Sequence, residues 1–331
     1  MNFFDNSYNI KPETIYIGGG TPSIDNGIHI VNILNILKTR YSFYDLKECT
    51  AEINPEDISD IFVKNIQSTV LNRLSLGIQS FNNKSLETFN RRYKNTEDFC
   101  ERLTLLKTHN YSLSIDLINY LEFSDLNKNL KSLKNILEKK LIQHISLYDL
   151  FIEKEAISYK LIEDQDQDKQ INYFRKTYKL IKQYGFRQYE VSNFSIKGNE
   201  SLHNKAYWLG SDFIGIGAGA HSKVKNKRYI SIESTDNSNT VTEEFITQPD
   251  LLKEYLLMRF RLFYPLSINL INKLFNIKFD EFFSNSLLIN TKKRFIIYRN
   301  KKNLSLTEKG KLFINSILCD MFIDIDDNFK Q

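Results

Sequence analysis

The sequence predicts an α/β protein: a partial (β/α) barrel followed by a small winged-helix-like module. Through the first 210 residues, short apolar segments alternate with amphipathic ones, which is the pattern of strands joined by crossover helices. From residue 249 onward the pattern changes to helices around one pair of short strands. A hydrophobic content of 41% over 331 residues is sufficient for a large core and excludes a disordered chain.

Six segments are predicted as strands because they are short, apolar and rich in β-branched side chains. They are TIYIGG from Thr14, LKECTAEI from Leu46, RLSLGIQ from Arg73, LSIDLI from Leu113, HISLYDL from His144 and QYEVSNF from Gln188. Alternation with helices favours a parallel sheet. In such folds the chemistry gathers where strands end and loops begin.

Amphipathic spacing predicts helices between these strands. They cover residues 28–39, 85–89 leading into 97–106, 126–139 and 168–184. The C-terminal part is predicted as helices at 249–260 and 266–275, strands at 295–299 and 303–306, and a last helix capped by Thr307. A Gly-rich turn, SDFIGIGAGAHS, covers 211–222. The expected domains are therefore a barrel at 1–225, a polar linker at 226–248 and a winged-helix-like domain at 249–331.

Composition limits the function classes. A net charge of +5, from 45 basic and 40 acidic residues, is spread too thinly to indicate a nucleic-acid partner. Winged-helix modules often bind DNA, but this one has no strongly basic helix, so we expect it to pack against the barrel. No apolar run has the length of a membrane span, and the N-terminus does not resemble a signal peptide. We therefore expect a cytoplasmic protein with at most peripheral membrane contact.

Polar or glycine residues lie late in, or just after, five successive predicted strands. They are Gly18 to Thr21, Glu52, Gln79, Asp116 and Asp149. Each alone is typical of a helix cap or a turn. Five in succession at the same edge of a parallel sheet favour a ligand site.

A series of motifs carries a family resemblance. The motifs are IGGGTP (17–22), AEINP (51–55), NRLSLGIQSFN (72–82), Arg91, IDLI (115–118), HISLY (144–148), YEVSNF (189–194), HNKAYW (203–208) and IGIGAGAHS (214–222). In this order the chain resembles the radical S-adenosylmethionine proteins related to oxygen-independent coproporphyrinogen III oxidase. HNKAYW is similar to the HNxxYW motif of the haem chaperone branch, the HemW-like proteins.

The resemblance implies that S-adenosylmethionine binds at the strand ends. It assigns the cofactor to Gly19, Gly20, Thr21, Glu52, Gln79, Arg91 and Asp116. The bare glycine backbone lets the methionine moiety approach closely, and Thr21 adds a hydroxyl group. Glu52 takes the ammonium group, and Arg91 pairs with the carboxylate. Gln79 and Asp116 hold the ribose hydroxyls.

The family also implies a [4Fe-4S] cluster, held by a CxxxCxxC loop that precedes the GGGTP strand. Only residues 1–13 precede Thr14, and Cys49, Cys100 and Cys319 do not form that motif. We therefore expect either that the native protein begins upstream or that binding has been retained without radical chemistry; the intact cofactor-facing residues favour the first. A second departure is NYLEF (119–123), where the family has a Gly-Leu-Pro-Gly type turn.

His203 is the residue that the resemblance assigns to haem. A neutral imidazole is a good axial ligand of haem iron, and Tyr207 and Trp208 lie one helical turn further on, where they could cover a porphyrin face. The alternative, a histidine that only hydrogen-bonds in the core, stays open at this point. His221 is a second candidate ligand.

Two functions follow from the resemblance. The first is a haem chaperone that binds haem and S-adenosylmethionine and passes haem to haem-accepting proteins. The alternative is an oxygen-independent coproporphyrinogen III oxidase, which requires the cluster. No catalytic residue is assigned, and whether the protein is an enzyme is left open.

Overall fold

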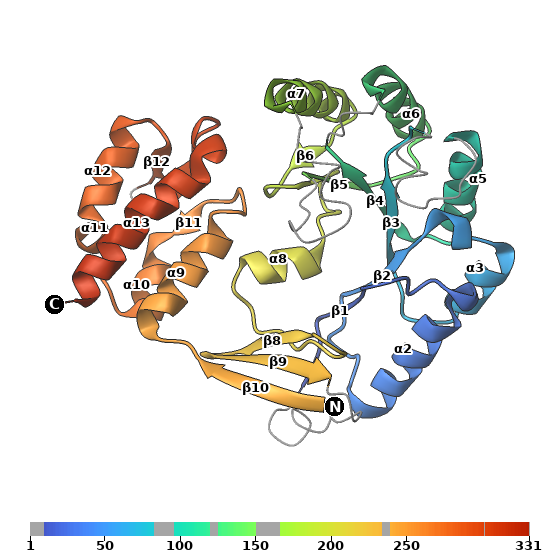
Figure 1. The fold of residues 1–331 in the computed structure, drawn as a ribbon, viewed down its shortest axis with the longest axis horizontal. Coiled ribbons are helices and arrows are strands. Elements are labelled where there is room, and N and C mark those ends of the chain that lie inside the picture. Colours follow the sequence, from blue (N-terminus) through green and yellow to red (C-terminus); the bar gives the residue numbers. More distant parts are fainter. Residues whose placement is uncertain are drawn as a thin grey trace. The chain divides into compact units, whose positions relative to one another are not determined.

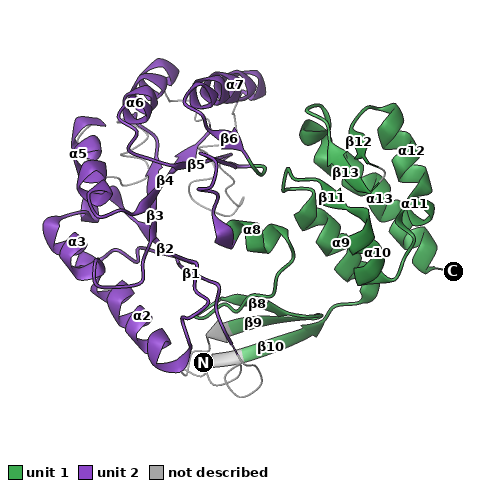
Figure 2. Ribbon diagram, turned by 180° about the vertical axis from the view of Figure 1, so that it is seen from behind, with its two compact units in different colours: residues 1–6, 189–191, 204–331 green, residues 7–188, 192–203 purple. Residues whose placement is uncertain are grey.

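The computed structural model describes residues 10–82, 96–119, 125–149, 166–233, 239–300 and 302–330. The chain divides into two compact units (Figure 2). The first, here called the barrel unit, consists of Ser7–Gln188 and Ser192–His203. The second, the C-terminal unit, is built from Tyr189–Val191 and the chain from Asn204 onward.

The described part of the barrel unit contains a seven-stranded sheet of order β1-β2-β3-β4-β5-β7-β6 (Figure 1). Its strands are β1 (Thr14–Ile17), β2 (Glu48–Ile53), β3 (Arg73–Gln79), β4 (Ser112–Ile118), β5 (His144–Tyr148), β6 (Arg187–Gln188) and β7 (Asn193–Ser195). The first five pair in parallel, each with its successor in the chain. The expected partial (β/α) barrel is confirmed in these five strands.

Helices follow the strands and lie along one face of the sheet (Figure 1). They are α2 (Ile28–Arg40), α3 (Asp60–Ile66), α5 (Thr96–Lys107), α6 (Leu126–Glu138) and α7 (Gln167–Gln183), with short 3₁₀ turns η1 (Asp25–Gly27) and η2 (Pro55–Asp57). Ser59, Asp125 and Asp166 cap α3, α6 and α7 by accepting a hydrogen bond from a first-turn N–H. The expected residues 85–89 and Arg91 lie outside the described residues.

The core of the barrel unit lies between the sheet and these helices. Alternate strand residues point to opposite faces, and the apolar set of each strand joins the helices in one buried cluster. Phe62, Phe99 and Phe194 are fully buried there. Burial of a large apolar side chain contributes about 1.5–3 kcal/mol, so this cluster fixes which face of each strand turns away from the helices.

The sixth expected strand, residues 188–194, is not continuous. β6 and β7 flank it and pair antiparallel, β7 also with β5. Between them, Tyr189 accepts a hydrogen bond from the Phe263 N–H, and the Val191 N–H donates to the Arg261 carbonyl. These backbone groups therefore bond within the C-terminal unit, which interrupts the strand.

The segment expected as a linker, residues 226–248, forms most of a three-stranded antiparallel sheet. Its strands are β8 (His221–Val224), β9 (Lys227–Glu233) and β10 (Asn239–Phe245). Arg228 and Glu244 lie opposite each other in β9 and β10 and form an ion pair, and Lys227 forms a diagonal ion pair with Glu243 across the same two strands. These cross-strand pairs explain why a hairpin here has the polar composition of a linker.

The rest of the C-terminal unit combines helices with a second three-stranded sheet, of order β11-β13-β12. The elements are α8 (Leu202–Trp208), which begins in the barrel unit, α9 (Gln248–Arg259), β11 (Leu266–Ser267), α10 (Ile268–Phe275), α11 (Phe279–Phe282), α12 (Ser284–Lys292), β12 (Ile296–Arg299), β13 (Asn303–Leu306), η4 (Gly310–Phe313) and α13 (Ile314–Phe329). Thr307 was expected to cap the last helix, but η4 begins only at Gly310 and α13 at Ile314, and neither has a side-chain cap; the Thr307 hydroxyl instead accepts from the Gly310 N–H at 2.9 Å in the turn before them. The sequence analysis did not anticipate α11 and α12.

Within the described residues, no helix combines the length and the apolar character that a membrane crossing requires.

Candidate functional site

Apart from Gly77 and Ile118, the face of the barrel sheet opposite the helices is polar from β1 to β5. Its residues are Thr14, Tyr16, Glu48, Thr50, Glu52, Arg73, Ser75, Ser112, Ser114, Asp116, His144, Ser146 and Tyr148. The sequence analysis found only the residues near the strand ends. The missed signal is the strict alternation within strands such as RLSLGIQ, where one face is entirely apolar and the other polar or glycine.

Exposure changes along this polar face. Glu48, Arg73 and His144, near the amino ends of their strands, are buried. Glu52 and Asp116, nearer the carboxyl ends, are half-buried. The polar face is therefore accessible at the carboxyl ends of the strands, where ligands bind in parallel α/β folds.

The glycines after β1 leave room for close approach to the backbone. Gly19 and Gly20 have φ angles of 86° and 62°, and a Cβ atom on either would meet no atom within 4 Å. A Cβ on Gly18 would instead lie 2.7 Å from the Tyr16 ring and 2.9 Å from the Glu52 carboxyl. The turn thus requires glycine for two reasons, left-handed backbone at Gly19 and Gly20 and crowding at Gly18.

Glu52 is held in place by two donors. The Tyr16 hydroxyl donates to Oε1 at 2.7 Å, and the Gly19 N–H donates to Oε2 at 3.1 Å. Burial and the neighbouring Glu52 charge both raise the pKa of Tyr16, so the phenol stays protonated as a donor. The carboxylate is fixed beside the glycine turn, where it can receive a cationic group.

Asp116 is held by hydroxyl groups. The Ser75 hydroxyl donates to its carboxyl at 2.9 Å, and Ser146 also hydrogen-bonds to it. Burial, aided by the charge of Glu52, raises the pKa of Asp116 from 3.8 to about 6, although the hydrogen bonds from Ser146 and Ser75 and the charge of Arg73 oppose this shift. A buried carboxyl group whose ionised form is destabilised in this way is typical of a functional site.

This shift predicts a pH-dependent stability. Because the pKa of Asp116 is raised in the folded state, its contribution to the free energy of unfolding is largest below about pH 4 and falls as the pH rises to about 6. Asp116→Asn removes this loss and keeps a polar side chain. We expect the variant to gain about 3 kcal/mol relative to the wild type between about pH 4 and pH 7.

Urea denaturation of both proteins at the two pH values measures this difference. Asp45→Asn, at an exposed position, is the matched control and should gain little. If the difference in free energy of unfolding between Asp116→Asn and the wild type does not change with pH, the raised pKa of Asp116 is contradicted.

Gln79 occupies an irregular end of β3. Its φ angle is 67°, and the pairing with β4 shifts register between Gly77 and Gln79. The Tyr148 hydroxyl donates to its side-chain oxygen. The sequence analysis placed Gln79 after the third strand. The bulge changes the direction of the Gln79 side chain relative to the regular alternation of β3.

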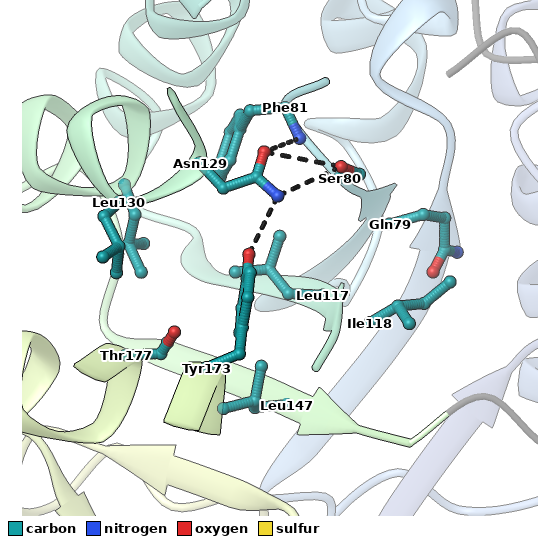
Figure 3. Close-up of a pocket in the computed structure, with 11 residues that line it drawn as sticks. Gln79, Ser80, Phe81, Leu117, Ile118, Asn129, Leu130, Leu147, Tyr173 and Thr177 are labelled. Atoms are coloured by element: carbon teal, nitrogen blue, oxygen red, sulfur yellow. Dashed lines mark hydrogen bonds between the residues drawn. The ribbon is translucent and has the colours of Figure 1, made fainter. Parts of the chain in front are cut away.

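Asn129 of α6 holds the residues that follow Gln79 (Figure 3). Its Oδ1 accepts from the Phe81 N–H at 3.0 Å, its amide contacts the Ser80 hydroxyl, and its Nδ2 donates to the Tyr173 hydroxyl at 2.8 Å. All of these residues line one pocket beside the sheet. A buried and fully paired amide of this kind fixes the path of the chain as it leaves β3.

Of the other residues assigned to the cofactor, Thr21 is exposed after the glycine turn, and Arg91 lies outside the described residues. The structure brings Gly19 and Glu52 into direct contact. It couples Asp116 to Glu52 electrostatically. Gln79 is joined to the polar face through Tyr148.

His203 lies against the polar face at the start of α8. Its Nδ1 is 2.9 Å from the Thr14 hydroxyl, and its ring stacks on Tyr16 with centroids 5.0 Å apart. Burial lowers the pKa of His203, an effect that the Glu48 charge partly opposes. The imidazole is therefore oriented by two residues of β1 and stays neutral at pH 7.

Glu48 fixes the backbone at His203. Its carboxylate accepts from the Ser201 hydroxyl at 3.0 Å and from the Leu202 and His203 N–H groups at 2.9 Å each. Arg73 lies 3.8 Å from this carboxylate, and both side chains are almost fully buried. The sequence analysis missed Glu48, Thr14 and Tyr16, because the contacts join positions more than 150 residues apart.

The other haem candidates belong to the C-terminal unit. Tyr207 packs edge-on against Phe213, with centroids 4.7 Å apart, and Trp208 lies beneath the Arg261 guanidinium. His221 is exposed at the start of β8. None of these contacts tests a role toward haem.

The three cysteines do not form a cluster. Cys49 and Cys100 are buried, burial raises the pKa of Cys49 to about 12, and Cys319 is exposed. Within the described ranges, no three His, Cys, Asp or Glu side chains are placed to hold a metal ion. The described residues therefore do not fit an iron–sulfur cluster, and we derive no chemical step through one.

The fold resembles that of a solved radical S-adenosylmethionine enzyme, the coproporphyrinogen III oxidase HemN of Escherichia coli. The TM-score is 0.79 at 19% sequence identity, over 93% of this chain and 77% of the enzyme. The chain thus has the fold of the radical S-adenosylmethionine class, with the polar sheet face that such a fold offers to a ligand. This likeness concerns the fold alone.

Sequence comparison identifies the family. The heme chaperone HemW of Buchnera aphidicola subsp. Acyrthosiphon pisum is 32% identical over 324 residues, covering 95% of this chain and 84% of the relative. HemW of Lactococcus lactis is 28% identical over 333 residues, covering 96% and 86%. No protein-family model matches the chain. The chain belongs to the HemW family of haem chaperones.

Proposed function

We propose that this protein binds haem through His203 and delivers it to haem-accepting proteins, and that it binds S-adenosylmethionine on the polar face of the barrel sheet. The family supports the chaperone function, because the relatives are named heme chaperones. The observation that carries the proposal is the placement of His203, whose ring is oriented by Thr14 and Tyr16.

The geometry suits an axial ligand. When Nδ1–H donates to the Thr14 hydroxyl, Nε2 carries the lone pair that binds iron. The lowered pKa of His203 favours the neutral imidazole, which is the form that ligates haem. Stacking on Tyr16 restricts rotation of the ring. Glu48 holds the backbone, so the ligand does not depend on a flexible loop.

The polar face suits S-adenosylmethionine. When bound, this cofactor supplies a sulfonium cation and the chemistry of its class. Glu52, fixed by Tyr16 and Gly19, would receive the ammonium group. Asp116 would accept from the ribose hydroxyls, and the open backbone at Gly19 and Gly20 would admit the methionine moiety. Equilibrium dialysis with Glu52→Gln measures this binding without requiring any reaction.

Haem titration followed by the Soret band tests the first part. We expect His203→Ala to weaken haem binding by at least about 100-fold and to shift the band, because the axial ligand is lost. Thr14→Val removes the orienting hydroxyl at nearly constant volume and should weaken binding by about tenfold. His109→Ala, at an exposed histidine, is the matched control.

Unchanged affinity and spectrum in His203→Ala, with the fold verified by circular dichroism, would remove the assignment. Delivery is tested separately. The haem-loaded protein is mixed with apomyoglobin, and the rate of haem transfer is followed by absorbance. Transfer no faster than from free haem would leave binding without a chaperone role.

A further inference from the structure

Tyr16 contacts one residue from each of the two binding sites proposed above. Its hydroxyl donates to Glu52 Oε1 at 2.7 Å, and its ring stacks on the His203 imidazole, with centroids 5.0 Å apart and planes inclined by 20°. Glu52 is the residue proposed to receive the ammonium group of S-adenosylmethionine, and His203 is the proposed haem ligand. All three residues belong to the barrel unit, so a single side chain of β1 joins the two sites within one unit.

Glu52 can accept a ligand without releasing Tyr16. A carboxylate offers about four acceptor positions. The Tyr16 hydroxyl and the Gly19 N–H occupy one position each, on different oxygens. An ammonium group on Glu52 would therefore add to the contact with Tyr16 and would not replace it.

The hydrogen bond between Tyr16 and Glu52 is accessible to water. Tyr16 is 36% exposed, and Glu52 is half-buried. A hydrogen bond that competes with water contributes little net free energy, and the same bond becomes stronger when water is excluded from it. A ligand bound on Glu52 would cover this contact and hold the phenol more firmly in its present position.

A restriction of Tyr16 acts directly on His203. The phenol ring lies close to the glycine turn, because a Cβ on Gly18 would lie 2.7 Å from Tyr16 Cε1. Thr14, two residues earlier on the same face of β1, holds the His203 Nδ1 at 2.9 Å. Since the imidazole is held at Nδ1 and stacked on the phenol, a fixed phenol also fixes the plane of the imidazole.

We propose that Tyr16 is a positioning residue shared by the two sites, so that S-adenosylmethionine and haem bind with positive cooperativity. This inference rests on the proposed function and adds the dependence of each site on the other. Each ligand holds Tyr16 in the position that the other ligand requires, so the entropy of ordering this side chain is lost only once. By linkage, the two ligands must raise each other's affinity by the same factor.

Haem titration followed by the Soret band, with and without saturating S-adenosylmethionine, measures this factor. We expect the wild type to bind haem about fivefold more tightly when S-adenosylmethionine is present. Equilibrium dialysis with and without haem should show the same gain in affinity for S-adenosylmethionine. Neither measurement requires a reaction.

Tyr16→Phe retains the stacked ring and removes the hydroxyl contact with Glu52. Whatever its affinity for each ligand alone, the factor by which one ligand raises the affinity of the other should fall to about one. Tyr184→Phe is the matched control, because the Tyr184 hydroxyl also donates to a carboxylate, that of Glu138, at 3.4 Å. This control should keep the wild-type factor.

Thr14→Val separates positioning from coupling. This variant should bind haem more weakly and still show the wild-type factor, because the contact between Tyr16 and Glu52 remains. Circular dichroism verifies the fold of each variant.

Haem affinity that is equal or weaker in the presence of S-adenosylmethionine would overturn the inference and leave both binding proposals standing. The inference is equally wrong if Tyr16→Phe keeps the wild-type factor. Failure of the proposed function has a different signature, because the wild type then does not bind haem, or does not bind S-adenosylmethionine, when that ligand is supplied alone. The single-ligand titrations therefore distinguish the two failures.

Discussion

Glu48→Ala should lower the free energy of unfolding by about 3–5 kcal/mol, because it leaves the buried Arg73 guanidinium without its carboxylate. The same substitution removes the acceptor of the Leu202 and His203 N–H groups. Among the described residues, Arg73 then keeps the Asn199 carbonyl and, at 3.4 Å, the Ser112 hydroxyl as its hydrogen-bond acceptors. Urea denaturation followed by circular dichroism measures the loss.

The control is an exposed pair. Glu13 lies 2.5 Å from Lys47, with both side chains largely in solvent, so Glu13→Ala should cost less than about 1 kcal/mol. Glu48→Gln should fall between the two. The double variant Glu48→Leu with Arg73→Met should recover part of the loss, because no buried charge remains unpaired. Equal costs for Glu48→Ala and Glu13→Ala would show that the buried network is not structural.

Glu48→Gln should also weaken haem binding if the proposed ligand is correct. The amide keeps the size of the side chain and one acceptor oxygen, but the backbone at His203 loses a charged partner. A loss of haem affinity in a variant that remains folded would identify Glu48 as a positioning residue. Haem titration of folded Glu48→Gln separates this effect from unfolding.

Gly215→Ala should destabilise the C-terminal unit by about 3 kcal/mol. A Cβ at Gly215 would lie 2.3 Å from the His221 carbonyl oxygen and 3.1 Å from the Ala220 Cβ. The backbone cannot move away easily, because Phe213 and Lys223 hydrogen-bond to each other in both directions beside it. The Ser222 hydroxyl also accepts from the Gly215 N–H at 3.0 Å.

Fluorescence of Trp208, the single tryptophan of the chain, reports unfolding of this unit in urea. Gly219→Ala is the matched control from the same motif. Its φ of 69° disfavours a side chain, but a Cβ there meets nothing within 4 Å, so it should cost about 1 kcal/mol. A smaller loss for Gly215→Ala than for Gly219→Ala would contradict the crowding argument.

Local pattern predicted much of the barrel. β3 begins and ends at the residues expected from RLSLGIQ, and α6 covers the expected segment up to Glu138. Such segments are long or strictly periodic, so local preference and burial agree. The polar hairpin of β9 and β10 was missed because its stability comes from cross-strand pairs, which a composition-based interpretation takes for a linker.

The sequence predicted the residues of the site that lie at strand ends, but not the partners that hold them. Residues at strand ends, such as Glu52 and Asp116, are visible because the parallel fold places all strand ends at one edge. The partners that hold them are not visible in the same way. Tyr16 and Ser75 lie within strands and appear, one at a time, as ordinary strand residues.

By itself, the sequence determined the order of strands and helices, the glycine turn after the first strand and the family to which the chain belongs, because these depend on local pattern and on motifs in a fixed order. Only the tertiary structure decided that Thr14, Tyr16 and Glu48 meet His203. Such contacts arise when a sheet aligns the same face of neighbouring strands, and no periodicity along the chain records which distant residue then packs against that face.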